Sequence, residues 1–409
     1  MSSIEPAEAS IEDAGNLLVA PRPLHEDGAV TGFLGAVVTP EEFASGSPDL
    51  AGKSVYLCGD VSGVPVDRLR AAARVFVVRE LSHGHREDVH RPWTFVDLGR
   101  VPLRVHGVGV YYRRYFDPDA DHFGRIRAEH AFQSLTESTK PGTAHRSGIY
   151  LTPVTRVGDD LHFRLLRCST NLSGPTEGFR ATDTLVVDAL NQEAATVFRN
   201  QAPLNHVLAQ IYHNTHATAE RKQSKAKISA HADKTKDMPA DGIMAFCTFY
   251  EGLDGLRPLD HDVFDRGVKG VSGLTRLHFR LKEPAARHAG AELPSQFTLT
   301  LYPGSVFFMP LSTNRLYTHE IRPSGLDATL LPTRLGYVVR CSGTEAVHKD
   351  GRTYLKVAED LVPLEPPTEA GMDKLRKLYA EENRTSSFID YGRDFPFSMN
   401  TGDYVAPRA

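Results

Sequence analysis

The sequence has few cysteines, no strong excess of charge and no long apolar run. Its four cysteines, among 409 residues, lie far apart without a Cys-x-x-Cys pair. This spacing argues against a disulfide framework and predicts buried free thiols in a reducing compartment. The acidic start, MSSIEPAEASIEDAG, lacks the apolar centre of a secretory signal, and no apolar stretch is long enough to span a bilayer. We therefore expect a cytoplasmic protein without a membrane partner.

The charge balance bears on the partners of the protein. A net charge of −4 and a pI near 6.5 provide no global attraction to nucleic acid, although a local basic groove would remain compatible with them. A hydrophobic content of 41% with 24% charged residues is typical of a globular protein. The chain is long enough for one large core or two moderate ones.

The first half of the chain changes character near residue 50. Residues 1–50 are rich in Ser, Pro, Gly, Ala and acids, which predicts a partly ordered leader. Residues 51–205 form a predicted N-terminal α/β portion that frames the active site. Its expected elements are the strands KSVYLCGDV and ARVFVVREL, the short helix VDRLRAAAR, a hairpin turning at Gly158-Asp159-Asp160, and a strand running into a helix within TDTLVVDALNQEAATVFRN. The loop GDVSGVP is typical of an ordinary turn rather than a phosphate site.

Strands follow one another quickly after residue 206. The alternating or β-rich runs HVLAQIY, AKISAHA, GIMAFCTFY, RLHFRL, FTLTLY, SVFFMP, RLYTHEI and RLGYVVRC are separated by Gly, Pro and Asp turns. Residues 206–345 are therefore predicted to form an antiparallel sandwich or barrel. Residues 346–409 follow as a hairpin turning at Asp350-Gly351, an amphipathic helix in MDKLRKLYAEEN and a tail. The predicted fold class is α+β and mainly β.

One histidine–aspartate pair lies where a predicted strand leaves the core. Side chains at positions i and i+2 of a strand share a face, so His231 and Asp233 can converge on one point. A third ligand is available from His319 in a later strand. Two histidines and one carboxylate on one face are the facial arrangement of non-haem Fe(II) centres. Taken alone, His319 is better explained as a core histidine beside Tyr317, and the next strand favours the metal site.

That next strand carries two arginines on one face. Arg334 and Arg340 are six residues apart in TRLGYVVRC, an even spacing. Arginine is costly to bury without a partner, and its planar fork pairs bidentately with carboxylates. Two inward-facing arginines beside a metal pair therefore predict a buried dianion with carboxylates to receive them.

These segments together resemble the AlkB-like branch of the 2-oxoglutarate/Fe(II) dioxygenases. The resemblance rests on AKISAHADKTKD, LTLYPGSVFFMPLSTNRLYTHEIRP and RLGYVVR, and covers roughly residues 205–342. It implies a double-stranded β-helix, or jelly roll, for the 206–345 core. It also implies Fe(II) as the metal, 2-oxoglutarate as co-substrate and O2 as oxidant.

The resemblance assigns roles to individual residues. It implies that His231, Asp233 and His319 hold the iron, that Arg334 binds the distal carboxylate of 2-oxoglutarate, and that Arg340 serves the carboxylate nearer the metal. The family's Asn-x-Tyr element corresponds here to Gln210-Ile211-Tyr212, so Tyr212 transfers directly and Gln210 stands as an amide substitute. Gly336 occupies a position between the arginines where the family would suggest a polar residue. A longer polar insert, HNTHATAERKQSK, also departs from the family pattern.

The implied activity is hydroxylation of a C–H bond, or demethylation through a hydroxylated methyl, with release of succinate and CO2. Because Asp233 is present, halogenation is disfavoured: related halogenases lack the carboxylate ligand and leave room for halide on the iron. The expected substrate is a small organic molecule of amino-acid, nucleoside or natural-product type. Oxidative dealkylation of nucleic acid is a second hypothesis, which the basic stretch ERKQSKAK keeps open. A third is a non-catalytic metal-binding scaffold.

Several other polar residues are interpreted conservatively. Lys234, Lys236 and Asp237 after the ligand pair are expected in a solvated turn, with substrate contact as the less favoured alternative. His213 and His216 are expected in a polar loop. The row Arg276, His278 and Arg280 could face an anionic substrate or water.

Overall fold

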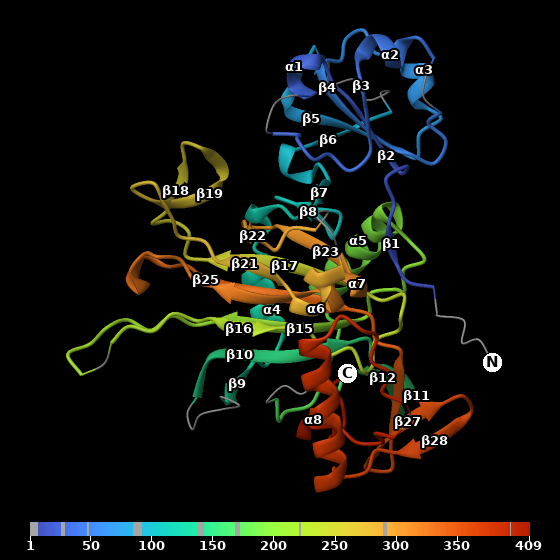
Figure 1. Cartoon of the computed structure of the whole chain (residues 1–409), viewed down its shortest axis with the longest axis vertical. Coiled ribbons are helices and arrows are strands. Elements are labelled where there is room, and N and C mark those ends of the chain that lie inside the picture. Colours follow the sequence, from blue (N-terminus) through green and yellow to red (C-terminus); the bar gives the residue numbers. More distant parts are fainter. Residues whose placement is uncertain are drawn as a thin grey trace.

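The computed structural model describes residues 7–25, 29–46, 49–84, 92–136, 143–167, 172–220, 222–288, 293–392 and 394–409. It is a mixed α/β structure, mainly β, with several sheets and few helices (Figure 1). Cys58, Cys247 and Cys341 are buried free thiols, as predicted, whereas Cys168 lies outside the described residues. No helix within these ranges is long and apolar enough to cross a membrane.

A five-stranded parallel sheet occupies one end of the molecule (Figure 1). Its order is β3-β2-β4-β5-β6, formed by β3 (Ala36–Val38), β2 (Asn16–Val19), β4 (Ser54–Asp60), β5 (Arg74–His83) and β6 (Thr94–Val96). The short helices α1 (Arg22–His25), α2 (Pro40–Ala44) and α3 (Val66–Leu69) connect its strands. Strand β4 and helix α3 agree with the predicted elements.

The beginning of the chain differs from the expected leader. Leu17, Leu18 and Val19 are fully buried in β2, which lies between β3 and β4 in the parallel sheet. A parallel strand covered on both faces needs a continuous apolar run, and NLLVA is long enough to form one. The average composition of residues 1–50 hid this short run. A segment expected to be partly ordered therefore contributes three strands, β1 (Ser10–Ile11), β2 and β3, and two helices.

The largest sheet contains nine strands and is mainly antiparallel. Its order is β13-β10-β15-β25-β17-β23-β8-β7, with β9 paired to β10. The strands are β7 (Leu103–Val105), β8 (Gly109–Tyr112), β9 (Gln133–Thr136), β10 (Thr143–Thr152), β13 (Glu177–Gly178), β15 (His206–Tyr212), β17 (Ile243–Glu251), β23 (Val306–Pro310) and β25 (Thr333–Arg340). Strands from both sides of the expected boundary at residue 205 therefore share one sheet.

Both faces of this sheet are covered, which explains why every residue of β15 is buried. Val207, Ala209 and Ile211 pack with α5 (Ala181–Val197) on one side. On the other side, Phe246 and its neighbours pack against a four-stranded sheet of order β16-β24-β21-β22. The strands of that second sheet are β16 (Ile228–His231), β21 (Arg276–Leu281), β22 (Gln296–Thr300) and β24 (Tyr317–Arg322).

Helix α5 corrects one sequence prediction. The stretch TDTLVVDALNQEAATVFRN was expected to begin as a strand, but it is helical from Ala181 to Val197. Val186, Leu190 and Val197 are buried at spacings typical of one helix face. The side chain of Asp183 accepts the backbone N–H of Arg180 and so caps the helix start. The β-branched valines suggested a strand because this capping signal was overlooked.

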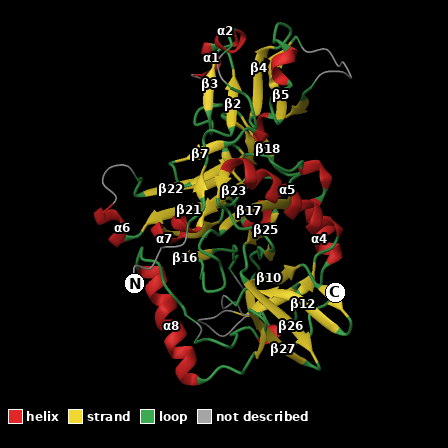
Figure 2. Ribbon diagram, turned by 90° about the vertical axis from the view of Figure 1, so that its right-hand side faces the viewer, coloured by secondary structure: helices red, strands yellow, loops and turns green. Residues whose placement is uncertain are grey.

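The C-terminal region is interleaved with an earlier hairpin (Figure 2). The five-stranded sheet β11-β12-β26-β27-β28 joins the predicted hairpin of β11 (Thr155–Val157) and β12 (Asp160–Leu165) to β26 (Thr344–Lys349), β27 (Arg352–Val357) and β28 (Asp360–Pro363). Helix α8 (Glu369–Arg384) matches the predicted amphipathic helix and buries Leu375 and Tyr379. The strands β18 (Arg257–Leu259), β19 (Asp262–Val268) and β20 (Val271–Ser272) form a separate three-stranded sheet, whose Phe264 packs into the core beside the parallel sheet.

Candidate functional site

The three proposed iron ligands converge at one end of the two central sheets. His231 is the last residue of β16 and lies directly opposite His319 of β24 in the strand register. Asp233 follows two residues later, just beyond the strand. Its Oδ1 lies 3.6 Å from His231 Nε2 and 3.9 Å from His319 Nε2. One ligand atom from each residue lies within 4.8 Å of the other two.

Each of the two histidines presents Nε2 to Asp233. The carbonyl of Ser229 lies 2.8 Å from His231 Nδ1 and can only accept, so Nδ1 carries a proton and Nε2 is the nitrogen available to the site. Burial, reinforced by the neighbouring His231, lowers the pKa of His319 to about 3. A two-histidine, one-carboxylate set of this kind fits Fe(II) by its donor chemistry.

Arg340 fixes the carboxylate of the set. Its Nη2 and Nε donate to Asp233 Oδ2 at 2.7 Å and 3.1 Å, so Oδ1 is left facing the histidines. Burial would raise the pKa of Asp233, but Arg340 and the two histidines outweigh it and hold the pKa well below its usual value. Arg340 was expected at the co-substrate carboxylate nearer the metal. In the structure both of these donors contact Asp233, and the co-substrate role of Arg340 stays a prediction.

Side chains from two helices hold the backbone around Asp233. Asn314, on α7 (Leu311–Leu316), accepts the N–H of Asp233 and donates to its C=O, both at 2.8 Å. Asn383 of α8 accepts the N–H of Ala232 at 2.7 Å. The ligand loop therefore obtains from two amide side chains the hydrogen bonds that a neighbouring strand would otherwise supply. The sequence prediction missed both asparagines, because neither lies near the ligands in the chain.

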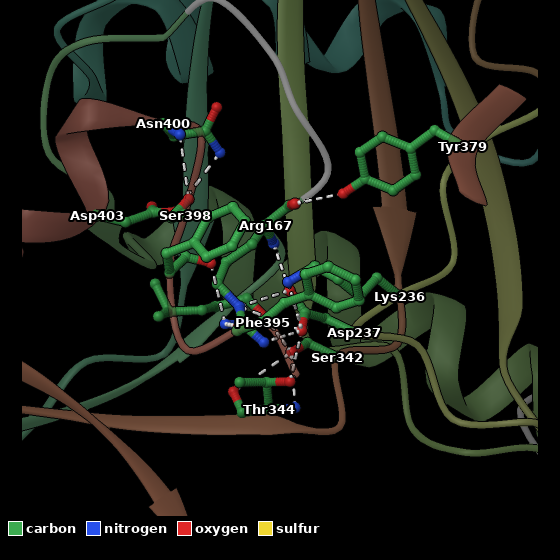
Figure 3. Close-up of polar contacts among 12 residues, drawn as sticks. Arg167, Lys236, Asp237, Ser342, Thr344, Tyr379, Phe395, Ser398, Asn400 and Asp403 are labelled. Atoms are coloured by element: carbon green, nitrogen blue, oxygen red, sulfur yellow. Dashed lines mark hydrogen bonds and ion pairs between the residues drawn. The ribbon is translucent and has the colours of Figure 1, made fainter. Parts of the chain in front are cut away.

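The loop beyond Asp233 is not the solvated turn that its charges suggested. Figure 3 shows Asp237 at the centre of a buried cluster. Arg167 donates to its carboxylate from Nη2 at 2.7 Å and from its backbone N–H at 2.6 Å. The Nη1 of the same arginine donates to the carbonyls of Phe395 and Phe397. Asp237 thus connects the ligand loop to the C-terminal tail through Arg167. The side chain of Lys236 is also buried, and its Nζ lies 3.8 Å from Asp237 Oδ1.

The register across the large sheet places three predicted site residues, Tyr212, Gln210 and Arg334, on one face. Tyr212 of β15 lies opposite Arg334 of β25, and Gln210 lies opposite Gly336. The guanidinium of Arg334 lies over the Tyr212 ring, 3.9 Å from its centroid. The Tyr212 hydroxyl donates to the side-chain oxygen of Gln210 at 3.3 Å. The amide substitution at Gln210 therefore keeps a polar contact with the tyrosine.

Gly336 has a steric explanation. A Cβ at this position would lie 2.9 Å from Arg334 Nη1 and 3.2 Å from Tyr212 Cε2. The stacked arginine and tyrosine occupy the space that a side chain would need. The absence of a polar residue between the arginines thus gives Arg334 room to lie flat on the ring.

We expect Gly336→Ala to weaken 2-oxoglutarate binding while sparing the metal ligands. Forcing a methyl group into a filled site costs about 1–3 kcal/mol, which corresponds to roughly five- to hundredfold in affinity. Calorimetric titration of 2-oxoglutarate into the metal-loaded protein measures the change. Gly325→Ala is the matched control, because nothing lies within 4 Å of its Cβ position. Equal 2-oxoglutarate affinity in the two variants would contradict the steric argument.

All seven predicted site residues line a single cavity of about 360 Å³. Its apolar wall includes Leu208, Phe246 and Val338. Two cationic lining residues, Arg146 of β10 and Lys234 of the ligand loop, were not predicted as site residues. The row Arg276, His278 and Arg280 does not line this cavity, and neither do His213 and His216. His213 instead forms a hydrogen bond with Ser147 at 3.0 Å.

A second histidine–carboxylate cluster lies away from the cavity. The ring nitrogens of His130 lie 3.0 Å from Glu177 and 2.7 Å from Asp183. With both nitrogens bonded to carboxylates, the ring is an imidazolium that donates twice and has no lone pair for a metal. Arg408 also pairs with Glu177 at 3.0 Å, so the cluster fastens the chain terminus. We interpret it as a structural ion network.

This network predicts a loss of stability at alkaline pH. Burial disfavours the charged ring, but Asp183 and Glu177 outweigh burial and raise the pKa of His130 above its usual 6.5. Its contribution is therefore complete below pH 6.5 and disappears as the pH rises through the raised pKa. Urea unfolding between about pH 6 and pH 9 measures the free energy of unfolding. His130→Gln should remove this part of the pH dependence; an identical slope in both proteins would refute the assignment.

The sequence matches no family model and no curated protein. Solved structures similar to the chain include a prolyl-4-hydroxylase, OsALKBH1 and the epimerase SnoN. A prolyl-4-hydroxylase from Pseudomonas putida has 11% identity and a TM-score of 0.29, covering 57% of this chain and 92% of its own. The protein OsALKBH1 has 12% identity and a TM-score of 0.33, over 58% and 99%. The non-haem α-ketoglutarate-dependent epimerase SnoN from nogalamycin biosynthesis has 12% identity and a TM-score of 0.28, over 56% and 73%. At these values, functional assignment depends on the site residues themselves.

Proposed function

We propose that the protein is an Fe(II)- and 2-oxoglutarate-dependent oxygenase that hydroxylates, or demethylates through hydroxylation, a small organic substrate. The observation that carries the proposal is the convergence of His231, Asp233 and His319 within 4.8 Å, in a cavity that Arg334 also lines. Bound iron would supply oxygen activation coupled to decarboxylation of 2-oxoglutarate to succinate and CO2.

Each residue of the chain has a defined task in this proposal. The two histidines and Asp233 would hold the metal on one face, while Arg340 keeps the carboxylate ionised and oriented. Arg334 would bind the distal carboxylate of the co-substrate through its planar fork, with Tyr212 and Gln210 supporting it. The apolar wall of the cavity would exclude water from the substrate side. A volume of about 360 Å³ supports a small molecule as the substrate.

We further propose that the two central sheets form the faces of a double-stranded β-helix. In this proposal the 206–345 segment supplies most of the core strands, and β8 and β10 of the N-terminal portion extend the larger face. The remaining expected units, residues 51–205 and 346–409, would frame the site and buttress the ligand loop. The domain boundaries and the cytoplasmic location remain predictions.

The proposal is tested by succinate formation. The purified protein with Fe(II), 2-oxoglutarate and O2 should release succinate slowly without substrate, and faster when a mixture of metabolites contains the substrate. Mass spectrometry of the mixture would then detect addition of one oxygen or loss of one methylene. Metal binding without any succinate release would favour a non-catalytic metal-binding scaffold. Tight binding of single-stranded DNA or RNA that weakens with salt would favour nucleic-acid dealkylation.

A further inference from the structure

Arg146 extends the row of cavity-facing residues beyond the predicted site. It lies on β10 directly opposite Tyr212 of β15, which lies opposite Arg334 of β25. Directly opposed residues in neighbouring antiparallel strands project to the same face. Strand spacing therefore places the backbones of Arg146 and Arg334 about 10 Å apart, on the same wall. Both residues line the cavity.

The contacts of Arg146 differ from those of Arg334 and Arg340. Arg340 is bound to Asp233, and Arg334 is stacked on Tyr212. Within the part of the chain that the structure describes, no carboxylate forms an ion pair with Arg146. It is half-buried, with Leu135 and Leu208 also on the cavity wall. A cation that lies against apolar surface is stabilised when an anion binds beside it.

The charged residues that line the cavity also favour an anionic ligand. Among its described lining residues, four are cationic (Arg146, Lys234, Arg334 and Arg340) and one, Asp233, is a carboxylate. Fe(II) and 2-oxoglutarate carry equal and opposite formal charges, so loading them leaves this positive excess unchanged. Lys234 lies one residue beyond Asp233, its Nζ 4.5 Å from the centre of the Tyr379 ring. The loaded site therefore still favours a negatively charged substrate.

We propose that Arg146 is a substrate-binding residue and that the substrate carries a carboxylate or phosphate group. This inference rests on the proposed oxygenase function and narrows its substrate class. Arg146 would receive the anionic group through its planar fork. The group would stand about two strand spacings from the distal carboxylate of 2-oxoglutarate. Binding at that distance would leave the carbon to be oxidised in the space between the anion and the metal ligands.

The test uses acetate and phosphate as probes and acetamide as the neutral counterpart of acetate. Each is titrated at constant ionic strength into the anaerobic protein loaded with Fe(II) and 2-oxoglutarate, whose metal–ligand charge-transfer absorption responds to nearby binding. The melting temperature provides a second readout that needs no absorption band. We expect saturable binding of acetate, phosphate or both, and none of acetamide. Which anion binds more tightly distinguishes a carboxylate substrate from a phosphorylated one.

Three variants determine whether Arg146 is responsible. Arg146→Met should weaken anion binding at least tenfold while Fe(II) and 2-oxoglutarate still produce their absorption band. Arg146→Lys should retain part of the affinity. Arg280→Met, an exposed arginine outside the cavity, is the matched control and should bind anions like the wild type. The proposal is overturned if the wild type shows no saturable anion binding, or if Arg146→Met binds as well as Arg280→Met. If the wild type formed no absorption band with Fe(II) and 2-oxoglutarate, that result would refute the oxygenase function instead.

Discussion

Asp233→Ala is expected to abolish succinate formation and to lower the affinity for Fe(II) by at least 100-fold. Loss of residues that merely orient metal ligands already costs about 10–100-fold, and Asp233 would supply a ligand atom itself. Its Oδ1 faces both histidines at 3.6 Å and 3.9 Å, so no other described carboxylate could replace it there. Anaerobic calorimetry with Fe(II), and with redox-stable Mn(II), measures the affinity directly.

The same substitution also tests the role of Arg340. Removing Asp233 would leave a buried guanidinium without the carboxylate that it contacts at 2.7 Å, which costs about 3–5 kcal/mol of stability. The double variant Asp233→Leu with Arg340→Met replaces the pair with apolar groups and should regain most of that stability without regaining iron. This separates loss of the metal from loss of the fold. Undiminished turnover in Asp233→Ala would remove Asp233 from the site.

The second large effect is expected at the Arg167–Asp237 cluster. Asp237→Ala would leave Arg167 and Lys236 buried beside an apolar group and should lower the free energy of unfolding by about 3–5 kcal/mol. Burial would raise the pKa of Asp237, but Lys236 and Arg167 hold it below its usual value, so the carboxylate is ionised at neutral pH. Urea unfolding at neutral pH measures the loss.

The variant should also weaken metal binding, because the cluster anchors the loop that carries Asp233. Asp159→Ala, an exposed residue in the turn between β11 and β12, is the control and should change stability by no more than about 0.5 kcal/mol. If Asp237→Ala behaved like this control, the cluster would not support the loop. Full iron affinity despite lower stability would show that the loop keeps its shape unaided.

The short-range patterns of the sequence predicted much of the β structure. Alternating or β-rich runs located β15, β17, β21, β23 and β25. These runs are strongly apolar because the strands are largely buried against α5, the opposite sheet or both. The even spacing of Arg334 and Arg340 correctly placed both on the cavity face. Pairing of strands far apart in the chain has no such local signal. This is why the union of β12 with β26, and of β10 with β15, was not predicted.

The residues that support the site could not be predicted from the sequence, for the same reason. Asn314 and Asn383 contact the ligand loop from 81 and 151 residues away, and Arg167 contacts Asp237 from 70 residues away. The charged residues in KTKDMP suggested solvent exposure. The sequence alone does not show that the distant Arg167 pairs with Asp237. Gly336 also had no local explanation until Tyr212 and Arg334 were placed together.

The contacts that fix the ligand loop have a consequence for the order of folding during synthesis. Asn383, Phe395 and Phe397 are synthesised after the loop near residue 235, yet they hold this loop directly or through Arg167. In a nascent chain that has not yet reached residue 383, His231, Asp233 and His319 exist, but the segment that fixes their loop does not. Tight binding at the proposed metal site would therefore begin only once this later segment has emerged and packed.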